Sequence, residues 1–111
     1  MSCNSRQKGK RGELEAAHAL NEQLPLAQAR RGQQYSGTET SADLVAAGLP
    51  NLYLEVKRRQ SMNIHKVLDE CEEHCGGLAP LVLHRKDNAD WIVSFRLEDL
   101  REVVKQLGGA M

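Results

Sequence analysis

The sequence predicts an α/β fold in which a mixed β-sheet is flanked by helices. Three segments repeat apolar residues at helical spacing, and five short apolar runs lie between them. Their order along the chain is helix, three strands, helix, two strands, helix. A chain of 111 residues is long enough for one such core but too short for two, so residues 1–111 are expected to form a single domain.

The first helix is expected from about Lys8 to Leu24, and Pro25 closes it because proline lacks an N–H and has a fixed φ. A first strand is expected to follow from Leu26 to Arg31. Residues 32–40 are polar and interrupted by glycine, which is typical of a flexible loop between two strands.

Two further strands are expected at Ala42 to Ala46 and at Leu52 to Lys57, joined by a turn at residues 48–51 that is short enough for a hairpin. Side chains alternate faces along an extended strand. Along the second of these strands, one set of alternate residues should point into a core: Leu52, Leu54 and Val56. The other set should share the opposite face: Tyr53, Glu55 and Lys57.

In the second half of the chain, a helix is expected from about Met62 to His74, and the glycines at 76–77 end it. Leu81 to His84 is a short apolar run of the kind found in buried strands. Residues 91–96 alternate as a half-buried strand does. Apolar residues spaced from Leu97 to Leu107 then predict a short final helix.

The composition is that of an ordinary soluble protein, with 41% hydrophobic and 27% charged residues. No apolar run approaches the length needed to cross a bilayer, so no membrane contact is expected. Residues 1–11 are polar and basic with no apolar stretch behind them, which does not fit a secretory signal. A cytoplasmic location is therefore expected, in the host cell if the protein is encoded by a phage.

The most informative residues are an acid on one strand and an acid and a lysine on the next. Asp43 and Glu55 offer hard oxygen ligands of the kind that Mg²⁺ binds, and Lys57 can help to activate a water or to stabilise charge on a phosphate. A third acid, Glu13, falls on an apolar helical stripe that consists of Ala16, Ala17, Leu20 and Leu24. A carboxylate on such a stripe is costly unless it is paired or bound to a metal.

Each of these residues also has an ordinary structural explanation. Glu13 could be a partly exposed acid in the first helical turn, where the helix dipole favours acids. Asp43 could cap a turn, and Glu55 with Lys57 could be an ion pair on a solvated strand face. These explanations must hold separately at four positions in the correct order, whereas one metal site explains all four. We therefore favour the metal site.

The order Asp43, then Glu55-Val56-Lys57, resembles the PD-(D/E)xK nuclease superfamily, with Ser41-Ala42-Asp43 where the name-giving motif has Pro-Asp. The resemblance implies a restriction-endonuclease-like core. It also implies that a divalent metal, Mg²⁺ or else Mn²⁺, is held by Glu13, Asp43 and Glu55, with the Val56 carbonyl as a further ligand. Lys57 would complete the catalytic set and would orient or deprotonate the attacking water.

Across nearly the whole chain the sequence resembles the small Holliday-junction resolvases of archaea and their phage relatives. The similar features are a basic opening, an arginine before a Ser-Gly loop at Ser36-Gly37, and a Gly-Gly after the second helix; the opening reads Lys8-Gly9-Lys10-Arg11-Gly12-Glu13. Those resolvases are symmetric dimers that cut paired strands at four-way DNA junctions. The resemblance implies a homodimeric, Mg²⁺-dependent endodeoxyribonuclease. The alternatives are a restriction-like or nicking endonuclease without junction preference, and a catalytically inactive DNA-binding module on the same fold.

The partner is expected to be DNA, branched or duplex, although the formal net charge is zero. Basic residues cluster near the motifs while acids crowd residues 69–73, so one basic face could bind phosphates without reading bases. The expected DNA contacts are Lys8, Lys10, Arg11, Arg30, Arg31, Ser36, Arg58 and Arg59.

The homodimer contact is expected on the last strand and the final helix, which have more apolar residues than one small core needs. These residues are Trp91, Phe95, Leu100 and Val104.

Overall fold

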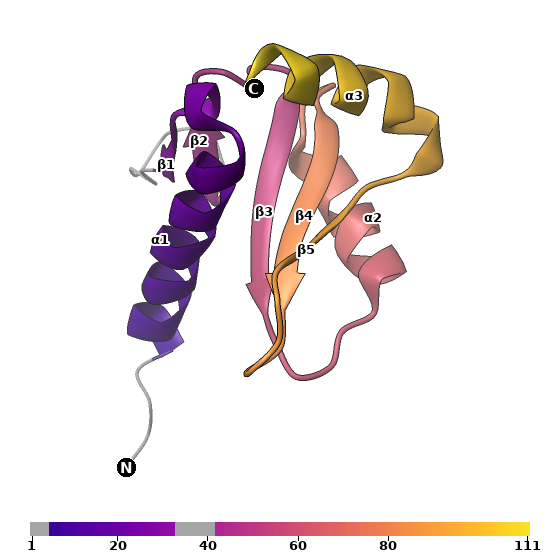
Figure 1. Cartoon of the computed structure of the whole chain (residues 1–111). Helices are drawn as coiled ribbons and strands as arrows, with labels where there is room; N and C mark the ends of the chain where they lie inside the picture. Colours follow the sequence, from indigo (N-terminus) through magenta and orange to yellow (C-terminus); the bar gives the residue numbers. More distant parts are fainter. Residues whose placement is uncertain (1–4, 33–41) are drawn as a thin grey trace.

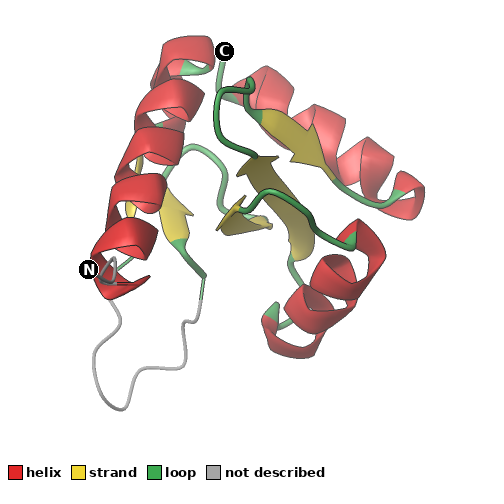
Figure 2. Ribbon diagram, turned by 90° about the horizontal axis from the view of Figure 1, so that it is seen from below, coloured by secondary structure: helices red, strands yellow, loops and turns green. Residues whose placement is uncertain are grey.

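The structure is a computed structural model, and it describes residues 5–32 and 42–111. Its centre is a five-stranded mixed sheet in the order β1-β2-β3-β4-β5, flanked by helices (Figure 1, Figure 2). The predicted fold class is therefore confirmed. With η for a 3₁₀ helix, the elements are α1 (Ser5–Gln23), η1 (Pro25–Ala27), β1 (Ala29–Arg31), β2 (Leu44–Ala46), β3 (Leu52–Arg58), α2 (Ile64–His74), β4 (Ala79–Arg85), β5 (Ile92–Ser94), η2 (Leu97–Asp99) and α3 (Leu100–Gly109).

The predicted motif strand, β3, lies in the middle of the sheet. It is antiparallel to β2 and parallel to β4, and it pairs with β4 from Leu52 opposite Ala79 to Arg58 opposite Arg85. Parallel neighbours need a long crossover connection, and α2 provides it. The acid and the lysine of the motif therefore lie in the C-terminal half of a central, well-paired strand, which holds their backbone rigidly.

Helices cover both faces of this sheet. On one face, Ala16 of α1 and Val103 of α3 are fully buried in a cluster that includes Leu52 and Leu54. On the other face, α2 packs over Tyr53 and over the fully buried Val82, which lie in a second cluster. The strand face that holds Tyr53, Glu55 and Lys57 is therefore partly buried. The helix α2 covers its first part, and Tyr53 is only 4% exposed.

The region that follows α1 differs from the expected strand. Pro25 occupies an early position of η1, and Gln28 adopts a left-handed conformation with φ of 52°, so the chain turns before it enters the sheet. The side chain of Asn21 then accepts a hydrogen bond from the Ala29 N–H at 2.7 Å and donates one to the Ala29 carbonyl at 2.8 Å. These contacts confine β1 to Ala29–Arg31. No helix in residues 5–32 or 42–111 has the length and apolarity to span a bilayer.

The elements of the second half are shifted by one to three residues. Asn63 caps α2 by accepting a hydrogen bond from the Lys66 N–H at 3.2 Å, so the helix begins at Ile64 rather than Met62. β4 is longer than expected because it pairs along all of β3. β5 is a short edge strand, and Val93 is 44% exposed as well as Ile92 at 54%, so the expected half-buried alternation is wrong there.

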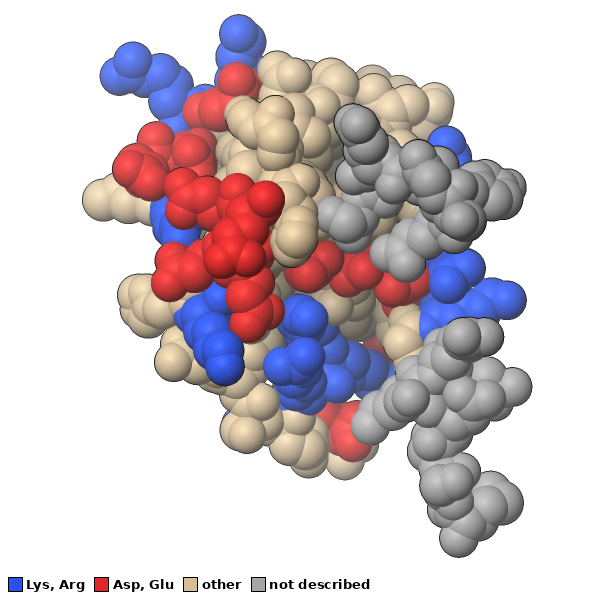
Figure 3. All heavy atoms as spheres, turned by 180° about the vertical axis from the view of Figure 1, so that it is seen from behind, with Lys and Arg blue, Asp and Glu red and all other residues tan. Residues whose placement is uncertain are grey.

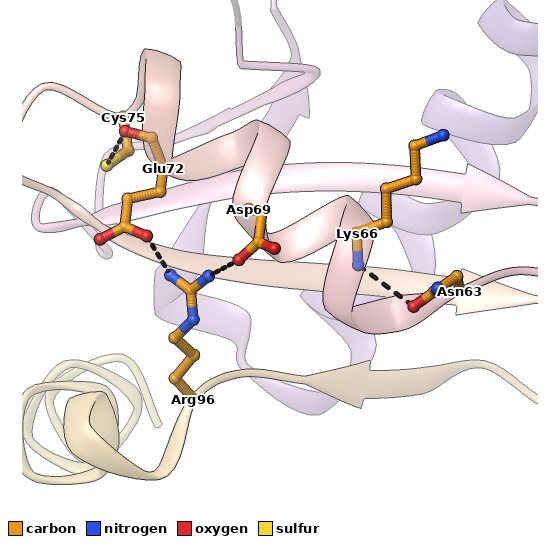
Figure 4. A network of polar contacts seen from close by, with 6 residues as sticks. All are labelled: Asn63, Lys66, Asp69, Glu72, Cys75 and Arg96. Carbon is orange, nitrogen blue, oxygen red and sulfur yellow. Dashed lines mark hydrogen bonds and ion pairs between the residues drawn. The ribbon is translucent and has the colours of Figure 1, made fainter.

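One arginine joins the C-terminal segment to α2. Arg96 lies between β5 and η2, and its guanidinium donates to Glu72 at 2.7 Å and to Asp69, as Figure 4 shows. The two acids are three residues apart and therefore lie on one face of the helix. Part of the acidic cluster at residues 69–73 is thus neutralised within the protein.

Candidate active site

The residues predicted to form the site meet at one hollow of about 430 Å³. It lies where the first turns of α1, the residue before β2 and the C-terminal half of β3 come together. Its described lining is Gly9, Gly12, Glu13, Asp43, Val56, Lys57, Arg58 and Arg59. Glu55 adjoins this hollow, since its carboxylate lies 4.0 Å from the Lys57 ammonium and interacts with Asp43.

Asp43 is the most firmly held of the acids. It precedes β2 instead of lying within it, and its N–H donates to the Leu54 carbonyl at 3.1 Å. Its own carbonyl accepts from the Gly32 N–H at 2.8 Å, and its carboxylate Oδ2 accepts from the Val56 N–H at 2.9 Å. The Asp43 carboxylate therefore accepts the hydrogen bond that a backbone carbonyl would accept if β2 extended this far. One hydrogen bond thus fixes the carboxylate against β3, and two backbone hydrogen bonds hold the residue that bears it.

Gly32 makes this arrangement possible. A Cβ atom at Gly32 would lie 2.6 Å from the Ala42 carbonyl oxygen and 3.3 Å from that of Asp43. Both contacts are with backbone, which cannot move aside as a flexible side chain can. A residue with a side chain at position 32 would push the end of β1 away from Asp43, so Gly32 is a positioning residue that the sequence analysis did not identify.

Glu13 faces the hollow from α1, but Arg31 of β1 holds it. The Arg31 Nε donates to Glu13 Oε1 at 2.7 Å, and the Glu13 side chain is only 18% exposed. Burial raises the pKa of Glu13, Arg31 opposes this rise, and the charge of Asp43 adds to it. The Glu13 carboxylate on the apolar stripe is thus paired, as expected where an unpaired charge would cost free energy. Arg31, which is predicted to contact DNA, also has this contact within the protein.

Glu55 lies in the least favourable electrostatic environment of the three acids. Burial and then the nearby charge of Asp43 raise its pKa from 4.5 to about 8, and the attraction of Lys57 only partly offsets them. Glu55 therefore keeps a proton at neutral pH. Acids whose pKa values are raised by each other's charges are typical of a site that lacks a countercharge.

The donor set fits a hard divalent cation. Carboxylate oxygens from Glu13, Asp43 and Glu55, with the carbonyl of the adjacent Val56, are the ligands that Mg²⁺ and Mn²⁺ prefer. As the side chains stand, no group of three or more His, Cys, Asp or Glu residues in the described part of the chain is arranged to hold a metal ion. Ligation by all three acids would therefore require side-chain rotation.

Sequence reasoning missed a second charged network beside the hollow. Arg58 of β3 and Arg85 of β4 are register partners, and Glu15 of α1 lies between them, 3.7 Å from the Arg58 Nη1 and 2.8 Å from the Arg85 Nε. Asp87 adds a contact to Arg58 at 3.3 Å. The register of β3 on β4 determines this meeting, and no local motif in the sequence predicts that register.

The predicted DNA contacts fall into two groups. Lys10, Arg11, Arg30 and Arg59 are exposed, and none of them forms an ion pair with another residue in the described ranges. Arg31 and Arg58, in contrast, pair with the acids just described. Ser36 and the side chain of Lys8 lie outside the described residues.

Acidic and basic side chains adjoin on the face seen in Figure 3, where a broad acidic patch lies directly beside basic groups. α2 is close to the site, because the charge of Glu55, after burial, helps to raise the pKa of the Cys71 thiol to about 12. Cys71 itself stays protonated and packs in the core beneath α2.

The fold and the hollow together define an α/β protein with a carboxylate-rich site beside its central strand. No protein-family model and no curated protein matches the chain. Among solved structures, Hjc of Archaeoglobus fulgidus, a Holliday junction resolvase from an archaeal hyperthermophile, is similar to 79% of this chain over 72% of its own length. The identity is 21% and the TM-score is 0.45. A likeness of this size does not establish a shared function, so the function proposed below rests on the residues of this chain.

Proposed function

We propose that this protein is a metal-dependent endodeoxyribonuclease that resolves four-way DNA junctions. The observation that supports the proposal most directly is that Glu13, Asp43 and Lys57, from three separate parts of the chain, line one hollow and that Glu55 adjoins it. The raised pKa values of Glu13 and Glu55 add to it, because burial and neighbouring acids outweigh the charges of Arg31 and Lys57, and a divalent cation would offset this excess of negative charge. Hard oxygen ligands beside a lysine are suited to phosphodiester hydrolysis.

In the proposed mechanism, Glu13, Asp43, Glu55 and the Val56 carbonyl would hold Mg²⁺ or Mn²⁺. When bound, the metal would supply Lewis-acid activation of the phosphodiester and of the attacking water. Asp43 would contribute the most firmly positioned carboxylate, since the Val56 N–H donates to its Oδ2 and its own N–H donates to the Leu54 carbonyl. The Lys57 ammonium, only 19% exposed, would orient the water and stabilise the negative charge that grows on the phosphate.

DNA would be bound through its phosphates rather than its bases. The exposed cations Lys10, Arg11, Arg30 and Arg59 are available for such contacts, and Lys8 and Ser36 belong to the same proposal from their sequence positions. Arg31 and Arg58 would join only by loosening their contacts with Glu13 and Glu15. The surface is suited to recognition of DNA shape, as a junction-resolving enzyme needs.

Two symmetric cuts require two sites, so we propose a homodimer. The apolar surface for it comes from α3, where Leu100 is 42% and Val104 is 59% exposed. Trp91 and Phe95 line an apolar groove of about 520 Å³ on the α1 and α3 side of the sheet. A second copy that covers α3 and the rim of this groove would bury the apolar residues predicted for the contact.

The test is a cleavage assay with Mg²⁺ on a four-way junction and on linear duplexes of matched sequence. Paired cuts at the junction are expected, and Asp43→Asn and Lys57→Ala should each lower the rate by about three orders of magnitude while the circular dichroism spectrum is unchanged. Equal cutting of all substrates would favour the restriction-like or nicking alternative. DNA binding without cleavage in any divalent metal would favour the inactive binding module.

A further inference from the structure

A second hollow, of about 270 Å³, adjoins the candidate site. It lies between the segment that joins β3 to α2 and the turn that joins β4 to β5. Its described lining is Arg59, Gln60, Ser61, Met62, Ile64, His84, Arg85, Lys86, Ala89, Asp90 and Ile92. Arg59 lines both hollows, so the second one begins where the site ends. We call it the flanking groove.

The walls of the flanking groove are held together by hydrogen bonds. The Arg59 N–H donates to the Arg85 carbonyl at 3.1 Å, which extends the β3–β4 pairing by one residue. The Asp87 N–H donates to Gln60 Oε1 at 2.7 Å, and Arg85 Nη1 donates to the Ala89 carbonyl at 3.0 Å. The groove is thus built in the protein alone and does not depend on a ligand to form it.

The floor of the flanking groove combines a flat ring with apolar surface. His84 is the register partner of Lys57, and side chains of register partners on parallel strands lie on the same face. Its Nε2 lies 2.8 Å from Ser94 Oγ, and burial lowers the pKa of His84, so the ring is neutral at pH 7. Ile92 is 54% exposed, and the half-buried Ile64 lies on the other side. This surface is suited to a nucleobase rather than to a phosphate.

The exposed charged residues that line the flanking groove are two cations, Arg59 and Lys86, and one acid, Asp90, so positive charge is in excess there. Arg59 and Lys86 are exposed, and neither forms an ion pair with a residue in 5–32 or 42–111. Their neighbour Arg58 differs, because Glu15 and Asp87 hold it. Two uncompensated cations beside an apolar floor complement one nucleotide, which has an apolar base and an anionic phosphate.

We propose that the flanking groove binds a single unstacked nucleotide next to the phosphodiester in the candidate site, with its base against His84 and Ile92 and its phosphate near Arg59 and Lys86. This inference rests on the proposed function and narrows its substrate class to DNA in which the nucleotide beside the cut lies at an interrupted stack, as at a branch point or bulge. Flipping a base out of an intact duplex costs stacking and pairing free energy, and this cost is smaller where the stack is already interrupted. The groove therefore favours branched DNA over linear duplex.

Binding tests this inference without relying on cleavage. The Asp43→Asn protein, in EDTA, is titrated by fluorescence anisotropy with three duplexes of equal length: fully paired, with one bulged thymidine, and with one bulged abasic nucleotide. We expect the bulged thymidine to bind about tenfold more tightly than the abasic bulge. Ile92→Ala and, independently, Lys86→Ala in this background should each reduce that preference, whereas matched changes outside the groove, Leu26→Ala and Lys105→Ala, should not.

Equal affinity for the thymidine and abasic bulges would overturn the inference, and so would a preference that Ile92→Ala and Lys86→Ala both leave intact. The outcome is separable from the proposed function. A wild-type protein that cuts DNA without any base preference in binding would refute the flanking groove alone. A base preference in a protein that cuts no DNA with any divalent metal would refute the nuclease and leave the groove. No binding to any of the three duplexes, in EDTA or with Mg²⁺ added to the same variant, would refute both.

Discussion

Replacing Glu55 by glutamine should stabilise the metal-free protein at high pH. The pKa of Glu55 is about 8 in the folded protein and 4.5 for an unburied glutamate. Between these values the folded state holds a proton that the unfolded state has lost, so the free energy of unfolding falls as the pH rises from about 4.5 to about 8. Below about 4.5 the effect vanishes, and above about 8 the full cost of the buried charge remains.

The size of this cost follows from the distance between the two pKa values. At about 1.4 kcal/mol for each tenfold change, it is on the order of 5 kcal/mol, and it combines the burial of Glu55 with the repulsion from the nearby charges of Asp43 and Glu13. The Glu55→Gln protein has the same shape and no charge at this position. We therefore expect it to be more stable than the wild type at pH 9 by a few kcal/mol, and of equal stability at pH 4.

Urea denaturation in EDTA from pH 4 to pH 9 measures this difference. Glu70 is exposed on α2 and outside every ion pair of the described residues, so Glu70→Gln is the matched control and should not change the dependence on pH. Mg²⁺ should restore stability to the wild type at pH 9 far more than to Glu55→Gln. If Glu55→Gln is no more stable than the wild type at pH 9, the carboxylate is not buried among uncompensated charges and the reasoning about the site is wrong.

Three further changes test the surroundings of the site. Arg59→Ala should weaken DNA binding and lower the salt slope of the affinity by about one, whereas Arg58→Ala should reduce mainly stability because its guanidinium pairs within the protein; equal salt slopes for both would contradict this division. Gly32→Ala should lower the melting temperature and cleavage together, because its Cβ would lie 2.6 Å from the Ala42 carbonyl; wild-type values for both would show that this contact is easily relieved. Val104→Glu should halve the mass measured by light scattering and abolish paired cuts, and a dimer that persists unchanged would exclude α3 from the contact.

The order of elements and the meeting of the acids could be predicted from local patterns. Hydrophobic periodicity identifies each helix and strand, and the spacing of Glu55 and Lys57 on one strand determines that they share a face. The boundaries were less predictable. Asn63 caps α2 by a side-chain contact, and Asn21 fixes β1 through hydrogen bonds to Ala29, eight residues away. Such contacts depend on the folded geometry and leave no periodic signal.

The tertiary contacts of the site could not be predicted from the sequence. Glu15 contacts Arg58 and Arg85 only because β3 and β4 pair in one particular register. Likewise, the burial of Tyr53 depends on where the crossover helix α2 lies, and the strand pattern alone does not reveal which face that helix covers. The sequence thus predicts which residues have functional side chains, and the pairing of strands determines which of these side chains form ion pairs within the protein.

The metal-free site compensates its excess of negative charge by two separate means. Glu13 is neutralised by an ion pair with Arg31, and Glu55 by a proton, while Asp43 is stabilised by hydrogen bonds from the backbone. If a divalent cation binds all three acids as proposed, it would compete with the Glu13–Arg31 ion pair and with the proton on Glu55. Because the proton leaves more readily at higher pH, cation binding would then be stronger at higher pH. A weaker ion pair would also free the Arg31 guanidinium, so the event that assembles the proposed metal site would make one of the predicted DNA contacts available.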